Sequence, residues 1–526
     1  MIIRKWLAPL CLNRPRRRSP LSVVPPAAVE VLEDRTLLTT FFVNADTGDD
    51  GNDGGVGDPF ATIQAAIDAA ANNGGDDTVV IAPGEYNENL VIDDASGDLT
   101  LTGNPFNRDA VVIDGDSNGD VISAALTNDV TIKNLRVTDG EGDGIDASGE
   151  SDLTVFNVTA IRNGDAGIRV AEGRDVTISY SEITDNDADG VNLLDVKDVT
   201  IKHTELEDNE LHGIRIEEAE DVFIYKVNAS ENVDEEGLHV IDADSVKVVG
   251  GRFNDNDVDD GGQGVDIENV DKVTILAIQA SGNGSDGLEI TESGDVYIKG
   301  GKFLNNGSND FDADGIDIET SGDVTVIAVN ASDNRQDGLD IENSGKVTIT
   351  AGLFSNNGRD DDGQDGDGIE ITDSGNAVIT GVIVKKNGDE GLDFDGPGDL
   401  IVRGGVFREN GFNGNSDDGL GGAGLRALGA GSVFIQGAVA SGNALDGIEI
   451  EEVGDITISD TTASGNGDDG LDVDGAEDVR LIRSAFLFND DEGVNLDNIA
   501  SIDFFFTFTF FNTGPNYTLD DVVIIA

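Results

Sequence analysis

The stretch GIRVAEGRDVTISYSEITDNDAD, residues 167–189, decides the fold. After the opening glycine, apolar and polar residues alternate, first at Ile168 and Val170 and again from Val176. Alternation with a period of two indicates strands that bury one face. Gly190 opens the next copy of the pattern, so 23 residues form one unit of short strands joined by turns.

Fifteen copies of this unit follow one another along the chain. The glycines that open them are Gly144, Gly167, Gly190, Gly213, Gly237, Gly264, Gly287, Gly315, Gly338, Gly368, Gly391, Gly424, Gly447, Gly470 and Gly493. Ten of the fourteen intervals are 23 or 24 residues long, and the other four add 4, 5, 7 and 10 residues between the third strand and the next glycine. A unit this short has no room for a helical crossover, so we expect each strand to pair in parallel with its equivalent about 4.8 Å away.

Two further patterns indicate that the units stack. In alternate units the third strand carries glycine and, two residues later, phenylalanine: Gly251 and Phe253, Gly301 and Phe303, Gly352 and Phe354, Gly405 and Phe407. The units between them carry smaller residues there, and large beside small is what a closely packed narrow core requires. An asparagine usually stands four residues before the opening glycine, and we expect a stacked ladder of Asn163, Asn186, Asn209, Asn283, Asn334, Asn387, Asn443, Asn466 and Asn489.

The repeat resembles the pectate-lyase-like right-handed parallel β-helix. Residues 58–92, DPFATIQAAIDAAANNGGDDTVVIAPGEYNENLVI, are similar to the start of many such chains, in which a helix, here Thr62 to Ala71, covers the first coil. The resemblance spans roughly residues 41–500 and implies an all-β solenoid of about 23-residue coils with an N-terminal capping helix. It does not specify a function, because this fold includes lyases, hydrolases, epimerases, adhesins and phage spikes.

The first 38 residues differ in composition from the rest of the chain. They hold seven of the 32 Lys and Arg residues, a short apolar stretch and the only cysteine, Cys11. Their end, VLEDRTLL, resembles the LEPR-x-LL leader of planctomycete-type exported and surface proteins, with Asp34 in place of proline. We therefore divide the chain into an export leader (1–38), an N-terminal cap with irregular first coils (39–143), regular coils (144–500), and a C-terminal cap or last strands (501–526). No segment has the roughly 18 uninterrupted apolar residues of a spanning helix.

The net charge of -73 is extreme and excludes nucleic acid as an expected partner. The first acidic column consists of residues just before the opening glycines: Asp143, Asp189, Glu236, Asp286, Asp314, Asp337, Asp367, Glu390, Asp446, Asp469 and Glu492. The second acidic column consists of residues two positions after them: Asp146, Asp266, Glu289, Asp317, Asp340, Glu370, Asp393, Glu449 and Asp472. Stacked like charges repel, so the columns are either a solvated, salt-screened face or a cation-binding face.

Two Asp-x-Asp-x-Asp-Gly phrases favour cation binding, because alternate carboxylates before a glycine resemble the start of a calcium loop. The residues are Asp185, Asp187 and Asp189 in one copy, and Asp310, Asp312 and Asp314 in the other. Neither copy has the glutamate of an EF-hand at the required position, since Val196 and Ser321 stand there. We predict calcium at both clusters.

An enzymatic alternative rests on a break in the acidic columns, where Asp189, His212, Arg215 and His239 are expected to lie in neighbouring coils. The phrase HGIRI, from His212 to Ile216, resembles the histidine and arginine elements of polygalacturonases, although the accompanying Asn-Thr-Asp and Gly-His-Gly phrases are missing. A histidine base beside an arginine would suit elimination or hydrolysis of a uronan.

The interpretation that we favour is a secreted or cell-surface acidic rod, structural or adhesive and calcium-binding, that contacts extracellular polysaccharide or cell-surface components. The alternative is a polysaccharide-active enzyme, namely a uronan lyase, an epimerase or a glycoside hydrolase. We also expect the four insertions, at residues 257–262, 308–313, 359–366 and 412–422, to emerge on one side of the solenoid.

Overall fold

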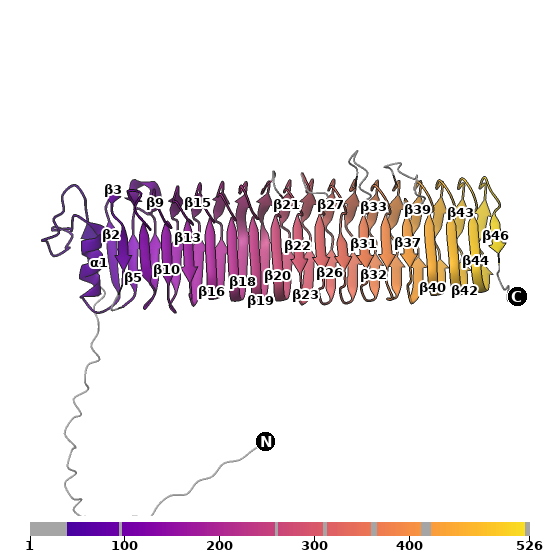
Figure 1. The fold of residues 1–526 in the computed structure, drawn as a ribbon, viewed down its shortest axis with the longest axis horizontal. Coiled ribbons are helices and arrows are strands. Elements are labelled where there is room, and N and C mark those ends of the chain that lie inside the picture. Colours follow the sequence, from indigo (N-terminus) through magenta and orange to yellow (C-terminus); the bar gives the residue numbers. More distant parts are fainter. Residues whose placement is uncertain are drawn as a thin grey trace, which may run out of the picture. The chain divides into compact units, whose positions relative to one another are not determined.

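The computed structural model describes residues 39–93, 97–257, 261–308, 313–358, 366–411 and 422–520. In these residues 46 strands form one continuous sheet around a single buried core. Each strand pairs in parallel with its equivalent one coil away, as where Ile168 to Ala171 lies beside Val191 to Leu194. The prediction of a parallel β-helix is confirmed, and Figure 1 shows its coils stacked along the long axis.

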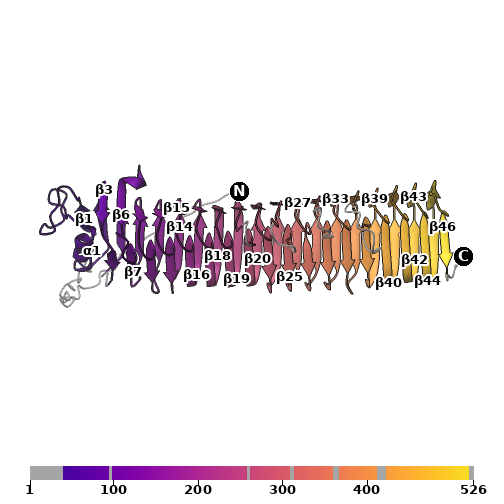
Figure 2. The same cartoon turned by 45° about the horizontal axis from the view of Figure 1, so that its top comes forward.

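The N-terminal end of the β-helix is covered by α1 (Ile63–Ala71), as predicted (Figure 2). Thr62 is its N-cap and accepts a hydrogen bond from the backbone N–H of Ala65 at 3.3 Å, and its apolar face is buried against the first coils. The other elements before residue 144 are β1 (Thr39–Val43), β2 (Asp77–Ile81), β3 (Gly84–Asn87), β4 (Leu90–Ile92), β5 (Leu99–Thr102), η1 (Arg108–Ala110), β6 (Val111–Asp114), β7 (Ile122–Ala125), β8 (Val130–Lys133) and β9 (Arg136–Thr138).

Each regular coil has three strands, counted from the opening glycine. Separate first strands are β10 (Ile145–Ser148), β13 (Ile168–Ala171), β22 (Leu288–Thr291), β25 (Ile316–Glu319), β28 (Asp340–Glu342), β31 (Ile369–Thr372), β34 (Leu392–Asp395), β37 (Leu425–Leu428) and β46 (Tyr517–Asp520). Separate second strands are β11 (Leu153–Phe156), β14 (Asp175–Ser179), β23 (Asp295–Lys299), β26 (Val324–Ile327), β29 (Val347–Thr350), β32 (Ala377–Thr380), β35 (Leu400–Arg403) and β38 (Ser432–Gln436).

The third strands lie on a separate face. They are β12 (Thr159–Ile161), β15 (Glu182–Thr184), β17 (Glu205–Glu207), β21 (Gln279–Ser281), β24 (Lys302–Leu304), β27 (Asn330–Ser332), β30 (Leu353–Ser355), β33 (Ile383–Lys385), β36 (Val406–Arg408), β39 (Val439–Ser441), β41 (Thr462–Ser464), β43 (Ala485–Leu487) and β45 (Phe508–Phe510). In some coils the strands run on without a break: β16 (Val191–Lys202), β18 (Ile214–Ser230), β19 (Leu238–Asn254), β20 (Val265–Leu276), β40 (Ile448–Ser459), β42 (Leu471–Ile482) and β44 (Val494–Phe505).

The core alternates in side-chain volume, as the sequence predicts. Phe303 pairs with Ala280 in the preceding coil and with Ala331 in the following coil. All three side chains are completely buried. A ring in one coil therefore fills the space that the small residues of its neighbours leave.

The asparagine ladder is longer than the four-residue spacing predicts. Asn283 donates from Nδ2 to Oδ1 of Asn306 at 3.0 Å, and Asn306 donates in the same way to Asn334 at 3.0 Å. The rule of an asparagine four residues before the opening glycine misses Asn306, because an insertion separates Asn306 from Gly315. The same reason explains the other ladder members that precede insertions: Asn256, Asn357 and Asn410.

The insertions therefore begin at one corner, directly after the asparagine ladder. The amides of Gly307, Gly358 and Gly411 each donate to the backbone oxygen of a ladder asparagine in the preceding coil. Residues 258–260, 309–312, 359–365 and 412–421 lie outside the described residues. Their arrangement as a ridge stays a prediction.

The regular pattern continues past residue 500. β45 pairs with β43, and β46 pairs with β44, in the same parallel register. Residues 1–38, the predicted export leader, and residues 521–526 lie outside the described residues. No helix in the described part of the chain is long and apolar enough to cross a bilayer.

Candidate functional site

Most of the first acidic column is buried, so it is not the solvated face that one interpretation of the sequence expects. Its residues lie at the corner before the first strand, where the carboxylate of each aspartate accepts the backbone N–H of the equivalent residue in the next coil. Asp143 Oδ1 accepts from Ala166 at 2.9 Å, and Asp446 Oδ1 accepts from Asp469 at 2.7 Å. The column is thus a second hydrogen-bonded ladder beside the first strands.

Burial raises the pKa of several of these carboxyl groups, and neighbouring carboxylates raise it further. The pKa of Asp143 is raised to about 7 by burial and by Asp165. Burial raises the pKa of Asp446 to about 8, although the hydrogen bond from the amide of Asp469 opposes the shift. The pKa of Asp469 is raised to about 8 for the same reasons. Part of this column therefore holds protons near neutral pH.

The second acidic column is mostly half-buried, and the pKa of several of its carboxyl groups is also raised. Burial raises the pKa of Glu289 to about 7, that of Asp340 to about 8 and that of Asp317 to about 9, with neighbouring carboxylates as the next cause. The two columns lie side by side. Carboxylates from both columns therefore come together.

Two groups of three carboxylates each bring one oxygen per residue within 4.8 Å of the others. These groups are Asp314, Asp317 and Asp340, and Asp337, Asp367 and Glu370. Asp337 is only 1% exposed, and its Oδ2 has no hydrogen-bond partner among the described residues. A buried carboxylate oxygen without a donor requires a proton or a cation.

The structure does not bring the predicted calcium ligands of the first Asp-x-Asp-x-Asp-Gly phrase together. Asp185 and Asp187 are exposed, whereas Asp189 is buried. Asp189 Oδ1 accepts from His212, and its Oδ2 accepts from Asn192 Nδ2 at 2.6 Å. The strand-to-turn geometry thus separates residues that are close in sequence.

In the second phrase, Asp310 and Asp312 lie outside the described residues. Asp314 belongs to the first of the two carboxylate groups described above.

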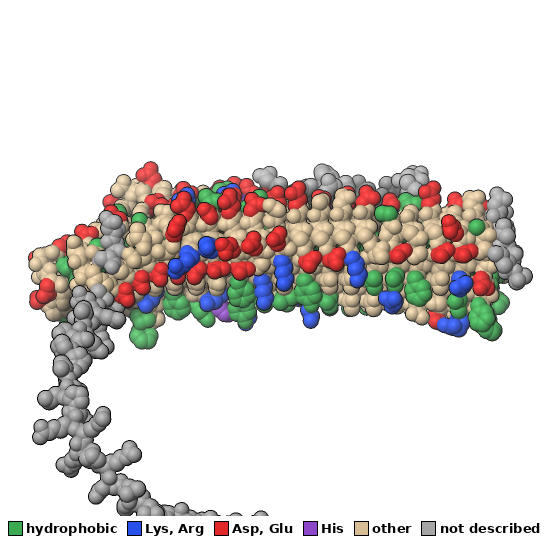
Figure 3. Space-filling view, turned by 90° about the horizontal axis from the view of Figure 1, so that it is seen from below, with side chains coloured by type: hydrophobic (Ala, Val, Ile, Leu, Met, Phe, Trp, Pro, Cys, Tyr) green, Lys and Arg blue, Asp and Glu red, His purple; other side chains and the backbone are tan. Residues whose placement is uncertain are grey.

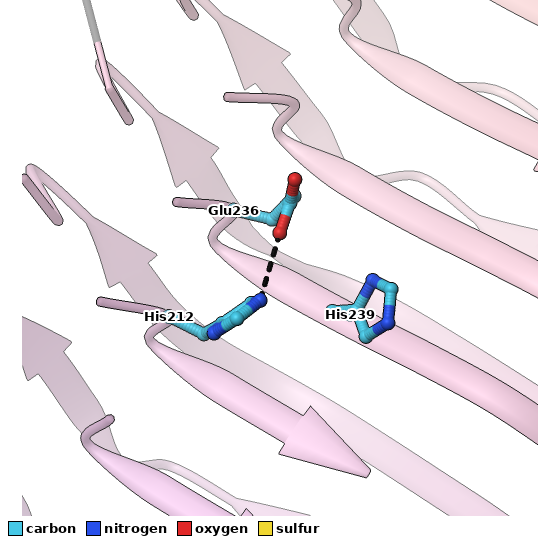
Figure 4. A group of neighbouring side chains, drawn as sticks. All are labelled: His212, Glu236 and His239. Carbon is cyan, nitrogen blue, oxygen red and sulfur yellow. Dashed lines mark ion pairs between the residues drawn. The ribbon is translucent and has the colours of Figure 1, made fainter. Parts of the chain in front are cut away.

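The break in the acidic columns holds a compact histidine cluster (Figure 4). His212 Nδ1 donates to Asp189 Oδ1 at 2.8 Å, and His212 Nε2 lies 3.0 Å from Glu236 Oε2. His239 Nδ1 donates to Asp266 Oδ2 at 2.7 Å. The sequence interpretation places Asp189, His212 and His239 near one another, and it omits Glu236 and Asp266 from the site.

This geometry does not leave His212 free to act as a general base. Burial lowers the pKa of His212, but the hydrogen bonds to Asp189 and Glu236 outweigh burial and raise the pKa to about 9. Both ring nitrogens are occupied, and the ring is protonated at neutral pH. Arg215 is hydrogen-bonded to Glu217 on the same strand rather than to the histidines.

A groove lies on another face, at the corner between the second and third strands. This basic groove has a volume of about 570 Å³, and its polar side chains are Glu205, Lys226, Asn228, Arg252, Gln279 and Lys302. Gly251, Ala277 and Gly301 line it between these side chains. Pairing of the third strands places Asn228, Arg252, Gln279 and Lys302 in one row along the β-helix, one residue per coil.

The core explains why the surface is hollow here. A Cβ atom at Gly251 would lie 2.6 Å from Val227 O, and one at Gly301 would lie 3.0 Å from the ring of Phe303. Both glycines also have φ above +110°. The coils that bury Phe253 and Phe303 thus carry glycine two residues earlier, and glycine leaves no side chain at the corner.

The basic groove belongs to a face that is poor in carboxylates. Figure 3 shows blue and green side chains along the lower long edge of the β-helix, below a band of red ones. The exposed cations in and next to the groove are Lys226, Lys247, Arg252, Lys299 and Lys302. None of them forms an ion pair within the described part of the chain.

Aromatic rings continue this corner toward the N-terminal end. Phe156, Tyr180, His203 and Tyr225 follow one another with ring centroids 5.6, 4.9 and 5.2 Å apart. Lys226 Nζ lies 5.1 Å from the ring centroid of Tyr225. The corner thus presents flat apolar rings followed by cations and amides.

Comparison with protein families gives one match, to the right-handed β-helix region, over residues 89–253, 212–360, 249–407 and 403–504. The chain belongs to the right-handed β-helix family. A comparison with curated proteins found no match.

Solved structures similar to this β-helix include enzymes that act on polysaccharides. The A-module of a mannuronan C-5 epimerase from Azotobacter vinelandii is 13% identical, with 88% of this chain and 94% of that chain covered and a TM-score of 0.30. Pectate lyase Pel9A is 15% identical, with 76% and 78% covered and a TM-score of 0.19. A lacto-N-biosidase from Eubacterium ramulus is 10% identical, with 93% and 68% covered and a TM-score of 0.18. TM-scores of this size carry no argument about activity.

The basic groove of this β-helix is absent from the sequence interpretation. Net charge averages over the surface and conceals a face where cations gather. A signal was available in two phrases, where Gly251 and Gly301 stand two residues before a buried phenylalanine and a cation, Arg252 or Lys302, lies between them.

Proposed function

We propose that this β-helix binds an acidic polysaccharide in the basic groove, outside the cell. The observation that carries the proposal is the set of five exposed cations without ion pairs among the described residues, in a chain with 105 acidic and 32 basic residues. Elsewhere some basic residues pair, as Arg169 does with Asp146 and Arg426 with Asp393, both at 2.9 Å. Single lysines such as Lys272 stand alone in the described part of the chain, whereas five cations gather in and next to the groove. An anionic ligand supplies the partners that the groove lacks.

The shape of the basic groove favours a linear polymer. Its row of side chains follows the axis of the β-helix in steps of about 4.8 Å, and Arg252 and Lys302 stand two coils apart, which is about 10 Å. Arginine binds carboxylate or sulfate through two parallel hydrogen bonds, and the intervening Asn228 and Gln279 offer donors and acceptors to hydroxyl groups. The adjoining rings present flat apolar surface against which sugar rings can pack.

The test is a binding panel with the full chain in EDTA. A polyuronate, a sulfated polysaccharide, a neutral glucan and single-stranded DNA are titrated at low and moderate sodium chloride concentrations. We expect saturable binding of at least one acidic polysaccharide, weakened by salt because charged contacts are screened. Tighter binding of the neutral glucan or of DNA, or no binding to any acidic polysaccharide, would contradict the proposal.

A second function, calcium binding by the acidic columns, is favoured by the unpaired Oδ2 of Asp337. We propose that Asp337, Asp367 and Glu370 bind Ca²⁺, for which carboxylate oxygens are the preferred ligands. A cation that binds only the folded chain adds about 2.7 kcal/mol to the free energy of unfolding at a hundredfold excess over Kd.

We therefore expect millimolar calcium to raise the melting temperature more than sodium chloride does at equal ionic strength. Asp337→Asn, which keeps an oxygen acceptor for the backbone, should reduce this gain. Asp333→Asn is the control, because Asp333 is exposed and close by in the same coil. Equal effects of the two salts on the wild type would show that the columns are only screened.

A further inference from the structure

Two of the three histidines of the chain come together with a glutamate on the first-strand face, away from the basic groove. His212 precedes Gly213, Glu236 precedes Gly237, and His239 is the second residue of β19. Each offers one nitrogen or oxygen atom, and these atoms lie within 4.8 Å of one another. Figure 4 shows the three side chains gathered from two adjacent coils.

Each histidine is held by a carboxylate at Nδ1. Asp189 holds His212 at 2.8 Å, and Asp266 holds His239 at 2.7 Å. Metal-binding histidines characteristically donate one ring N–H to a carboxylate, which fixes the ring and leaves the other nitrogen for the metal. Here Asp189 and Asp266 take up Nδ1, and His212 Nε2 shares its proton with Glu236 Oε2 at 3.0 Å, so a metal would displace that proton.

We propose that His212 and His239, each through one ring nitrogen, and Glu236, through a carboxylate oxygen, bind one zinc-type divalent ion. Two imidazoles and a carboxylate are a ligand set that zinc uses with water in the fourth position, whereas calcium prefers oxygen ligands alone. Ligand atoms around tetrahedral zinc lie about 3.3 Å apart, because the bonds are about 2.0 Å long. His212 Nε2 and Glu236 Oε2 are already 3.0 Å apart, so this pair needs only a small movement, and the atom of His239 lies within 4.8 Å of both residues' ligand atoms.

The surroundings suit a cation. The carboxylates of Asp189 and Asp266 add negative charge next to the ligands without occupying Nε2. The side chains of His212, Glu236 and His239 are 13%, 13% and 18% exposed, so an ion can reach them from solvent. Zinc replaces the proton that His212 Nε2 shares with Glu236, and that proton leaves to solvent.

The test uses full-length protein stripped with EDTA and titrated calorimetrically with zinc chloride at pH 8. We expect one zinc ion per chain, binding at least 100-fold more weakly in His239→Ala and unchanged in His203→Ala. His203 is the third histidine and stacks on Tyr180, with ring centroids 4.9 Å apart, so it is a matched control. Asp266→Asn should weaken binding by about 10- to 100-fold.

Two readouts guard against a change in folding. Melting temperatures without metal should match among the variants, and Glu236→Gln replaces His239→Ala if that variant melts earlier. Cobalt chloride should give the visible absorption bands of a tetrahedral site in the wild type and lose them in His239→Ala or Glu236→Gln. No saturable zinc binding, equal affinity in these variants, or full competition by equimolar calcium would overturn the proposal.

Discussion

Lowering the pH from 8.5 to 5.5 in EDTA should raise the melting temperature of this β-helix. Burial raises the pKa of Asp446 and Asp469 to about 8, well above the value of about 4 in an unfolded chain. At a pH between the unfolded and the folded pKa, the folded chain binds more protons than the unfolded chain. The stability of the folded chain therefore falls as the pH rises through this range. Each pKa unit corresponds to about 1.4 kcal/mol, and two such groups therefore amount to several kcal/mol.

Replacing the two aspartates by asparagine tests whether their titration causes this pH dependence. Asp446→Asn with Asp469→Asn keeps the oxygen acceptors of the ladder and removes both titrations, so the melting temperature should depend less on pH and be higher at pH 8.5. Asp455→Asn with Asp478→Asn is the matched control, because both residues are exposed in the same two coils. A wild-type melting temperature that rises from pH 5.5 to 8.5 would contradict this account.

Phe303→Ala should destabilise the coil stack by about 3–5 kcal/mol. Phe303 is completely buried, and its neighbours in the stack, Ala280 and Ala331, are too small to fill the space. The backbone of adjacent coils is fixed by parallel pairing, so the cavity cannot collapse. The loss is measured as the change in free energy of unfolding from denaturant titration.

Phe156→Ala is the control for that substitution, since Phe156 is 41% exposed on β11. It should cost far less than Phe303→Ala. Equal losses for the two variants would mean that the alternation of large and small residues does not organise the core.

The fold was predictable because its signal is periodic. A strand pattern that returns every 23 residues fixes which residues stack, and it places Asp189 beside His212 without any structure. Burial of the first acidic column was not predictable. Spacing locates Asp337 next to an opening glycine, but it does not say whether a corner residue turns inward.

The site was less predictable than the fold because it depends on side chains at corners. Asp185 and Asp189 fit a calcium phrase in sequence, yet one is exposed and the other is buried against His212. The basic groove exists because Gly251 and Gly301 have no side chain at the corner. The net charge of the whole chain gives no indication of such a groove.

The most direct test of polysaccharide binding is a calorimetric titration of charge-reversal variants with the acidic polysaccharide that binds best. Lys226→Glu with Lys302→Glu reverses two charges in the basic groove, and Lys272→Glu with Lys346→Glu reverses two exposed lysines away from it. Hydrogen bonds to charged groups contribute about 1.5–3 kcal/mol each, so the groove variant should bind at least tenfold more weakly than the wild type. The control should bind like the wild type. Equal loss in both variants, or no loss in the groove variant, would contradict the account.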